Sequence, residues 1–461
     1  MTQQQTQAWL EAEFAGAVQR AGVPGASIAV LQDGQLATAA AGLLSLATGV
    51  EATVDSVFQI GSITKLWTAS LVMQLVDEGL VELDQPIQTY LPEFEVADQS
   101  AAATITVRHL LSHQAGFEGD IFTDTGRGDD AIARYVATLD ELPQVFPPGA
   151  LFAYNNAGYV VLGRLVEKLR DQPYNTALSQ WLATPLGLTS VSPSPYEAIL
   201  HRVAVGHVEG PDGQIEPAPF WAMAPSNAPA GSMLAMTAGD LVGFARLALN
   251  QGQAPDGARL LGPGAVQAML TRQVDLPRLT GMGQAWGLGY EIDADQPTLV
   301  VGHDGNTIGQ AAFLRIVPEA GLAIALLTNG GDPYQLFSQT VSVLLRDLIG
   351  FEQELWPAPP AQPTATDFDF TPCLGRYVSS IADFVVRRDD DGRFWMDRLP
   401  KGLLLEMGER PDQQELVPLG PDQLIQKEPI GGLYPIFAFL GDDGRGRRRY
   451  IHYGRVVERA D

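Results

Sequence analysis

Apolar residues recur at every fourth position near the start of the chain, in the segment 7–20, at Leu10, Phe14 and Val18. This period predicts an amphipathic helix. Two continuous apolar runs follow at 26–31 and 36–41, with Gln-Asp-Gly-Gln between them. Because glycine tolerates positive φ, an Asp-Gly pair between two such runs predicts a β-hairpin.

The strand pattern returns towards the middle of the second half of the chain. Apolar runs at 298–301, 311–317 and 322–328 predict three further strands, the last two joined by a tight Pro-Glu-Ala-Gly turn. The segment 334–348 predicts one amphipathic helix. Strands at both ends with helices between them predict an α/β (α+β) fold. In that fold one antiparallel sheet is built from both ends, and a helical region over about 62–270 packs against it.

The last part of the chain has a different pattern. Short apolar runs alternate with predicted turns, the runs at 384–386, 402–405 and 434–440 and the turns at 389–392, 410–413 and 441–444. This alternation predicts a small all-β domain, a barrel or lipocalin-like sheet, over 367–461. Four prolines in 357–366 predict a stiff linker. The expected division is therefore a first domain at 1–356, the linker at 357–366 and the β-domain.

Composition excludes several classes of partner. The 461 residues include 29 Lys and Arg against 54 Asp and Glu, for a net charge of −25. Such a surface repels phosphate backbones and anionic lipid, so neither nucleic acid nor a membrane is an expected partner. The single cysteine, Cys373, excludes an intrachain disulfide. The start of the chain shows no basic and apolar leader pattern, which favours a cytoplasmic location.

The first candidate for chemistry is Ser62, followed by Lys65 and a strongly apolar stretch. A helix that begins near Ser62 places both side chains on one face, one turn apart. A serine hydroxyl needs an adjacent base, and a lysine amine can serve if desolvation lowers its pKa. The helix N-terminus also offers the Ser62 N–H to an oxyanion. The alternative for this spacing is a capping serine with a surface lysine.

The second candidate is the pair Tyr154 and Asn156, in a turn before an apolar helix. Two residues apart, the side chains can point into one cleft. A phenol can shuttle a proton, and an amide can hold a substrate carbonyl or a lysine. The alternative is a turn tyrosine beside an asparagine helix cap.

The third candidate is the segment 302–309, Gly-His-Asp-Gly-Asn-Thr-Ile-Gly, at the end of a predicted strand. Gly305 would let a ligand approach the strand backbone closely. The Asn306 N–H would then be a second oxyanion donor, with His303 lining the cleft beside it. A histidine that serves only packing is the alternative.

A metal site is not expected. His109 and His113 have the i, i+4 spacing of a zinc-binding pair, but no carboxylate follows at a suitable spacing. We interpret them as part of a packed helix end.

Taken together and in this order, the three segments resemble the serine β-lactamase and penicillin-binding-protein superfamily. The resemblance is to the branch with class C β-lactamases, D-aminopeptidases, D-alanyl-D-alanine carboxypeptidases and related esterases. Ser62 and Lys65 match its S-x-x-K motif, and Tyr154 and Asn156 match its Y-x-N motif. His303 stands where many members have the lysine of K-T-G, and H-x-G is a variant of the esterase and peptidase-like branch.

The resemblance covers roughly residues 10–350 and implies a β-lactamase/transpeptidase-like fold with two-step acyl transfer. It implies that Lys65, or Tyr154 in concert with it, takes the Ser62 proton. The N–H groups of Ser62 and Asn306 then hold the oxyanion, and Tyr154 protonates the leaving group. No metal or organic cofactor is implied.

The expected function is a serine hydrolase that cleaves amide bonds of short or D-residue-containing peptides, with a small molecule or short peptide as substrate. The alternatives are a carboxylesterase or acyltransferase, a β-lactamase, and a non-catalytic acyl sensor or binding module. A neutral His303 offers less charge to a drug carboxylate than lysine does, which disfavours the β-lactamase. The β-domain, with its motif Leu374-Gly-Arg-Tyr377, is similar to one in related D-amino-acid peptidases, where it can shape the site mouth or drive oligomerisation. A homo-oligomer is one expectation from this resemblance, and the alternative is a β-domain that only stabilises the first domain.

Overall fold

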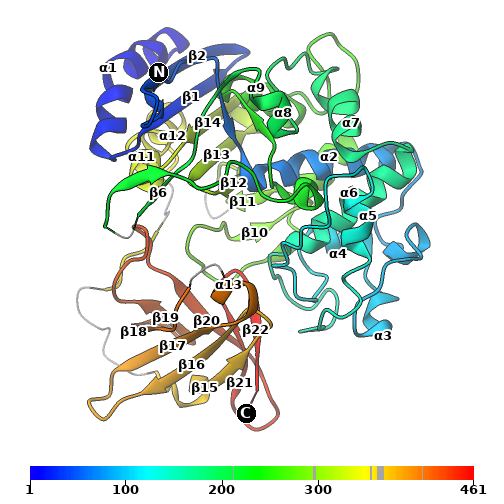
Figure 1. The fold of residues 1–461 in the computed structure, drawn as a ribbon, viewed down its shortest axis with the longest axis vertical. Helices are drawn as coiled ribbons and strands as arrows, with labels where there is room; N and C mark the ends of the chain where they lie inside the picture. Colours follow the sequence, from blue (N-terminus) through cyan, green and yellow to red (C-terminus); the bar gives the residue numbers. More distant parts are fainter. Residues whose placement is uncertain (211, 294–296, 353–355, 361–367, 407–408, 461) are drawn as a thin grey trace.

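The centre of the molecule is a mixed α/β body around one antiparallel sheet (Figure 1). The computed structural model describes residues 1–460 apart from 211, 294–296, 353–355, 361–367 and 407–408. Among these residues, nine strands run in the order β3-β2-β1-β14-β13-β12-β11-β10-β9. Their bounds are β1 Gly25–Gln32, β2 Gln35–Ser45, β3 Val50–Glu51, β9 Val274–Asp275, β10 Ala285–Trp286, β11 Glu291–Asp293, β12 Val300–Thr307, β13 Gln310–Val317 and β14 Leu322–Thr328.

The predicted hairpin and the predicted joining of the two ends are both confirmed. Asp33 and Gly34 connect β1 to β2 with φ of +49° and +80°. Positive φ at both central positions is typical of a type I′ turn, whose twist matches that of the two strands. On its other edge β1 pairs with β14, with Ala26 opposite Thr328. The sheet is therefore built from segments far apart in the sequence.

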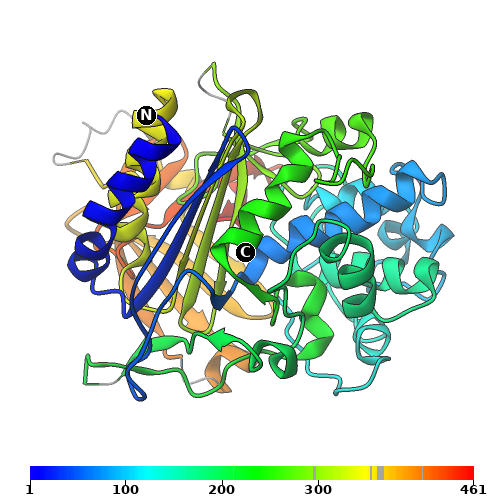
Figure 2. The same cartoon turned by 90° about the horizontal axis from the view of Figure 1, so that it is seen from above.

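Three helices cover one face of the sheet, namely α1 Gln3–Arg20, α11 Pro333–Gln339 and α12 Val341–Ile349 (Figure 2). Leu10, Phe14 and Val18 of α1 are buried there, as their spacing predicts. The single helix predicted over 334–348 is wrong, because the chain breaks at Thr340 into α11 and α12. The Thr340 hydroxyl donates to the Leu336 carbonyl at 2.6 Å, and this side-chain bond competes with regular helix geometry.

The opposite face carries the helical region, whose central helices are α2, α6 and α9. The α-helices here are α2 Thr64–Asp77, α3 Gln99–Ala102, α4 Val107–Leu111, α5 Ala131–Val136, α6 Asn156–Arg170, α7 Tyr174–Leu178, α8 Pro195–Ala198, α9 Ala238–Leu249 and α10 Pro263–Met269. Short strands and single turns complete it: β4 Ser56–Gln59, β5 Arg202–Val203, β6 His207–Glu209, β7 Ile215–Pro217, β8 Ala235–Met236, η1 Gly61–Ile63 and η4 Pro225–Ala230. None of the described helices is long and apolar enough to cross a bilayer.

The C-terminal part forms a closed barrel of eight strands, in agreement with the predicted barrel (Figure 1). The strands are β15 Gly375–Val378, β16 Ala382–Arg388, β17 Phe394–Pro400, β18 Asp412–Gly420, β19 Gln423–Gln426, β20 Ile436–Asp442, β21 Arg448–His452 and β22 Val456–Arg459. The run 402–405 is not a strand but belongs to helix α13, Gly402–Glu406. A short apolar run cannot by itself distinguish the two, and leucine favours helix. The turn predicted at 410–413 is shorter than expected, since β18 begins at Asp412.

The barrel is attached to the helical region through the connection between β21 and β22. The Tyr154 N–H donates to the Gly454 carbonyl at 2.9 Å, and His452 Nε2 lies 2.8 Å from the Phe152 carbonyl oxygen. These contacts place the barrel directly beside the turn that carries Tyr154. Residues 361–366 of the predicted linker lie outside the described residues, and the division into two domains stays a prediction.

Candidate active site

Ser62 lies in the single turn η1, between strand β4 and helix α2. The α-helix begins at Thr64 rather than at Ser62, yet Lys65 still lies one turn along on the same side. Lys65 Nζ lies within hydrogen-bond distance of Ser62 Oγ, at 3.1 Å, and donates to the Ala230 carbonyl at 2.7 Å. The structure thus brings together the serine and lysine that the sequence singled out.

The environment of Lys65 disfavours its charge. Its side chain is fully buried, and this burial lowers its pKa well below the ordinary value of 10.5. The positive charge of Arg455 lowers the pKa further, while the carboxylate of Asp120 opposes the shift. Lys65 Nζ also lies 4.8 Å from the centroid of the Tyr154 ring. A neutral amine beside a serine hydroxyl is the arrangement a general base requires.

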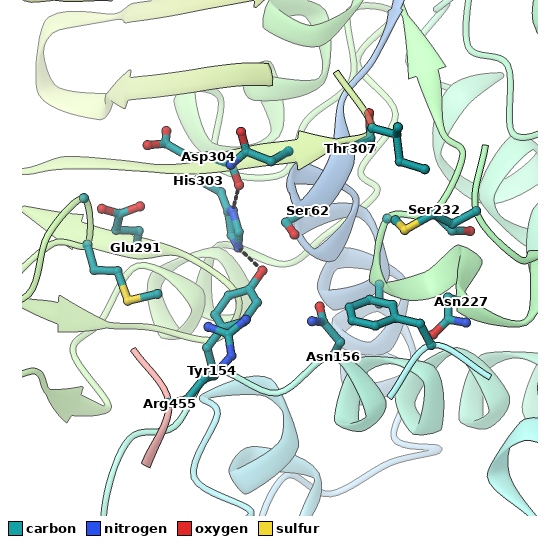
Figure 3. Close-up of a pocket in the computed structure, with 18 of the residues that line it drawn as sticks. Ser62, Tyr154, Asn156, Asn227, Ser232, Glu291, His303, Asp304, Thr307 and Arg455 are labelled. Carbon is teal, nitrogen blue, oxygen red and sulfur yellow. Dashed lines mark hydrogen bonds between the residues drawn. The ribbon is translucent and has the colours of Figure 1, made fainter. Parts of the chain in front are cut away.

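The side chains of Tyr154 and His303 point toward each other on one side of Ser62 (Figure 3). The Tyr154 hydroxyl lies 3.4 Å from His303 Nε2, and His303 Nδ1 lies 2.5 Å from the Asp304 carbonyl oxygen. A carbonyl oxygen only accepts, so Nδ1 carries the proton and Nε2 accepts from the phenol. Burial raises the pKa of Tyr154 and lowers the pKa of His303 to about 3. Near neutral pH the phenol is therefore protonated and the imidazole is neutral.

Glycines allow the backbone around Ser62 to pack closely. A side-chain carbon added at Gly305 would lie 2.9 Å from the Ser62 nitrogen, and one at Gly231 would lie at the same distance from that atom. One added at Gly61 would lie 2.6 Å from the Asn306 nitrogen. The sequence predicts that Gly305 admits a ligand. In the structure, the space that a Gly305 side chain would occupy is taken by the backbone of Ile60 and Ser62. Gly302–Gly309 also lies mostly within β12 rather than beyond it.

Asn156 contacts an acidic residue. Its side-chain N–H donates to Asp120 Oδ1 at 2.8 Å, whereas Lys65 contacts Ser62 and the Ala230 carbonyl. Asn155 is the residue that caps α6, because its side chain accepts from the Gly158 N–H at 2.7 Å. Asp120 in turn forms an ion pair with Arg455 of the barrel at 2.6 Å. Asn156 still lines the cavity in front of Ser62.

A cavity of about 460 Å³ lies in front of Ser62 (Figure 3). Its wall includes Ser62, Tyr154, Asn156, His303, Asn306 and Arg455. Lys65 lies below this surface, fully buried. The volume falls within the usual range for small-molecule sites. One side of the cavity is contributed by the barrel, through Arg455 and Leu433.

Sequence reasoning missed Asp120, Arg455 and Glu291. Glu291 lines the same cavity, and its burial together with the Asp304 carboxylate raises its pKa. Asp304 itself pairs with the buried Arg315. No local motif marks Asp120 or Arg455, because their partners lie hundreds of positions away. Glu291 begins the short strand β11, whose sequence is Glu-Ile-Asp, and nothing in that sequence distinguishes it from a surface carboxylate.

The histidines of the candidate zinc pair both have structural contacts. His109 Nδ1 accepts from the Thr106 N–H at 3.2 Å, and His113 Nδ1 accepts from the Asn155 N–H at 3.0 Å. The His113 ring packs 4.3 Å from the ring of Tyr154, measured between centroids. Within the described part of the chain, no group of three metal-ligating side chains lies together.

Comparison with known proteins extends this picture. The family model described as Beta-lactamase matches residues 10–341. The chain is 43% identical over 357 residues to penicillin-binding protein 4 of Amycolatopsis lactamdurans, an alignment that covers 77% of this chain and 93% of that protein.

Among solved structures, that of SurE with D-Leu has a TM-score of 0.78 at 30% identity and covers 99% of this chain and 100% of SurE. A D-stereospecific amidohydrolase from Streptomyces sp. has a TM-score of 0.56 at 25% identity, covering 72% of this chain and 97% of its own. The match to SurE includes the barrel, whereas the coverage of the amidohydrolase is confined to a smaller part of the chain.

Proposed function

This chain belongs to the beta-lactamase family of serine hydrolases, and from that premise we propose that it forms an acyl-enzyme on Ser62. Its substrates are then amides of short peptides that contain D-residues. The observation that carries the proposal is the contact of 3.1 Å between Lys65 Nζ and Ser62 Oγ, made where burial favours the neutral amine. No other described lysine is buried in this way.

In the first step, neutral Lys65 takes the Ser62 proton and Ser62 Oγ attacks the substrate carbonyl carbon. The carbonyl π electrons move to oxygen, and the backbone N–H groups of Ser62 and Asn306 hold the resulting anion. The close packing at Gly61 and Gly305 supports this role, because it keeps the two nitrogens on adjoining segments.

In the second step, the C–N bond breaks and the leaving amine needs a proton. Tyr154 is suited to deliver it, since its phenol stays protonated and lies between Ser62 and His303. The proton that Lys65 took from Ser62 then replaces it. Water attacks the ester on Ser62 in the same manner, which releases the acid and restores the serine.

The D-residue preference is supported by the relatives. The Streptomyces amidohydrolase is described as D-stereospecific, and the SurE structure contains D-Leu. A neutral His303 in place of the K-T-G lysine argues against a β-lactamase that relies on a cation at this position. The family resemblance and the cavity volume favour substrates of peptide size.

Intact mass spectrometry after treatment with a fluorophosphonate tests the nucleophile. We expect one adduct on the wild type and none on Ser62→Ala. Ser100→Ala is the matched control, because Ser100 is exposed on α3 and should leave labelling unchanged. Absence of an adduct on the wild type would contradict the proposal.

A panel of D- and L-aminoacyl p-nitroanilides and the corresponding ethyl esters then tests the substrate class. Faster turnover of D-amides supports the proposal. Turnover confined to esters would instead favour the esterase, and a stable adduct without turnover would favour an acyl sensor. Acylation by a penicillin followed by rapid release of the product would favour the β-lactamase as the alternative function.

A further inference from the structure

The barrel contains a second cavity, of about 540 Å³, at the end that adjoins the active site. Apolar side chains from three strands line it, among them Phe384, Met396, Ile436 and Phe437. The rest of the barrel interior is packed with side chains such as Tyr377, Leu424 and Phe439. The mouth of a β-barrel is a common place for a ligand site, and the volume matches such sites.

The two cavities share part of their walls. Thr280 and Leu433 line both of them. The Thr280 hydroxyl donates to the Tyr434 carbonyl at 2.6 Å and accepts from the Ile436 N–H at 3.2 Å, which fixes this loop against the barrel. Asp120 lines the barrel cavity and pairs with Arg455, which lines the active-site cavity. A molecule that extends from Ser62 past Thr280 therefore reaches the barrel.

Two acceptor atoms in the barrel cavity have no partner among the described residues. Gln426 is only 4% exposed, yet its Oε1 atom accepts no hydrogen bond. Asp412 is half-buried as a residue, but its Oδ1 atom is buried and has no hydrogen-bond partner. Both residues line the cavity. Buried acceptors without donors are rare in folded proteins and destabilise them, so a ligand that carries N–H donors would relieve this cost.

We propose that the barrel cavity binds the part of the substrate remote from the scissile bond. The occupant is an apolar peptide segment whose backbone N–H groups donate to Gln426 and Asp412. A free fatty acid fits less well, because its carboxylate would meet Asp412, and Arg398 is already paired with Glu409 at 2.5 Å. This inference rests on the proposed function and specifies its substrate as a peptide long enough to span both cavities.

Peptide amides of increasing length test the proposal. The probes are a D-leucyl p-nitroanilide and two series, from dipeptide to hexapeptide, that extend leucine- and alanine-rich sequence from either side of a D-residue amide. In the wild type we expect kcat/KM to rise by about tenfold along one of the series, the worth of one buried apolar side chain. Equal kcat/KM for all lengths in both series would overturn the proposal.

Two neighbouring leucines of α13 provide the variant and its control. Leu404 is half-buried and lines the barrel cavity, whereas Leu405 is 45% exposed and does not. Leu404→Trp should fill the mouth and abolish the gain with length, while turnover of the D-leucyl anilide stays unchanged. Leu405→Trp should keep both the gain in kcat/KM with peptide length and the turnover of the D-leucyl anilide. If Leu404→Trp leaves the gain with length intact, the cavity is not the binding site.

Gln426→Leu supplies an independent readout. Replacing an unpartnered buried amide by an apolar side chain of similar size should raise Tm and, at the same time, lower kcat/KM for the long peptide. A fall in Tm together with unchanged discrimination by length would contradict the assigned role. If the wild type does not turn over the D-leucyl anilide at all, the proposed function is refuted. That result differs from turnover without a gain with length, which refutes only the proposal for the barrel cavity.

Discussion

Arg455 of the barrel and Asp120 of the helical region form an ion pair of 2.6 Å at the edge of the cavity in front of Ser62. The Arg455 guanidinium carbon lies 4.5 Å from the centroid of the Tyr154 ring. Asp120 also accepts from Asn156 at 2.8 Å. The barrel is therefore joined to the site by an ion pair and by the contact of Arg455 with Tyr154. Removal of the barrel would leave Asp120 without Arg455 as its ion-pair partner.

The ion pair should set the pH dependence of acylation. Lys65 acts as a base when neutral, so kcat/KM rises with pH through its pKa. Arg455 lowers that pKa and Asp120 raises it. Arg455→Met removes the lowering charge and leaves Asp120 unopposed, so the acid limb of the kcat/KM profile should move to higher pH. Asp120→Asn should move it to lower pH.

The control for these profiles is Arg449→Met. Arg449 is a barrel arginine that pairs with Glu458 at 2.8 Å on the surface, and it does not line the cavity in front of Ser62. Its replacement should leave the profile unchanged. Identical acid limbs in wild type, Arg455→Met and Asp120→Asn would show that Lys65 is not the titrating base.

Replacing Lys65 should abolish most of the activation of Ser62. General-base assistance contributes about 10²–10⁴-fold, so Lys65→Met should slow fluorophosphonate labelling by that factor. Lys168→Met is the matched control, because Lys168 is partly exposed on α6 and lies 3.8 Å from Glu93. The labelling rate followed by mass spectrometry is the measurement. A Lys65→Met enzyme that labels at the wild-type rate would assign the base to another group.

Gly305→Ala tests the close packing behind Ser62. The added methyl group would lie 2.9 Å from the Ser62 nitrogen and closer still to the Ile60 carbonyl oxygen. Overpacking of this kind costs about 1–3 kcal/mol, and the displaced η1 turn should also slow acylation. Gly264→Ala is the control, since nothing lies within 4 Å of the added carbon. Urea unfolding and the labelling rate together measure both effects.

Buried histidines should make the fold sensitive to acid. Burial lowers the pKa of His303 to about 3 and of His452 to about 4, and lowers that of His113 well below 6.5. The unfolded chain takes up protons from pH 6.5 downwards while the folded chain does not. The contribution of these histidines to stability is therefore full above pH 6.5 and falls towards pH 4, by about 1.4 kcal/mol per pH unit for each histidine. The raised pKa of Glu291 opposes this fall by about the share of one group, so a net loss of stability is still expected.

Urea unfolding at pH 7, 6 and 5 measures this slope. His452→Gln should reduce the slope of the unfolding free energy against pH by the contribution of one histidine. His201→Gln should not, because His201 is exposed and remains in water when the chain is folded. Equal unfolding free energies at pH 7 and pH 5 would contradict the argument.

Much of the fold follows from local pattern alone. The Asp33-Gly34 turn, the strands around it and helix α1 depend on residues within a few positions of one another, where periodicity and turn chemistry are informative. The pairing of Ser62 with Lys65 is of the same kind, because one helical turn fixes their separation. Short apolar runs do not distinguish a strand from a helix. The run 402–405 was therefore predicted wrongly as a strand, and it forms part of helix α13.

Other features depend on contacts that no local pattern encodes. Arg455 and Asp120 are 335 positions apart, and only the docking of the barrel brings them together. The burial that lowers the pKa of Lys65 comes from residues of several elements, including the Ala230 carbonyl and the ring of Tyr154. Local sequence patterns were thus enough to predict the strands, the turn and the spacing of Ser62 and Lys65. Tertiary packing decided their charge state and joined the barrel to the site, because desolvation and electrostatic interactions depend on all the atoms nearby in space.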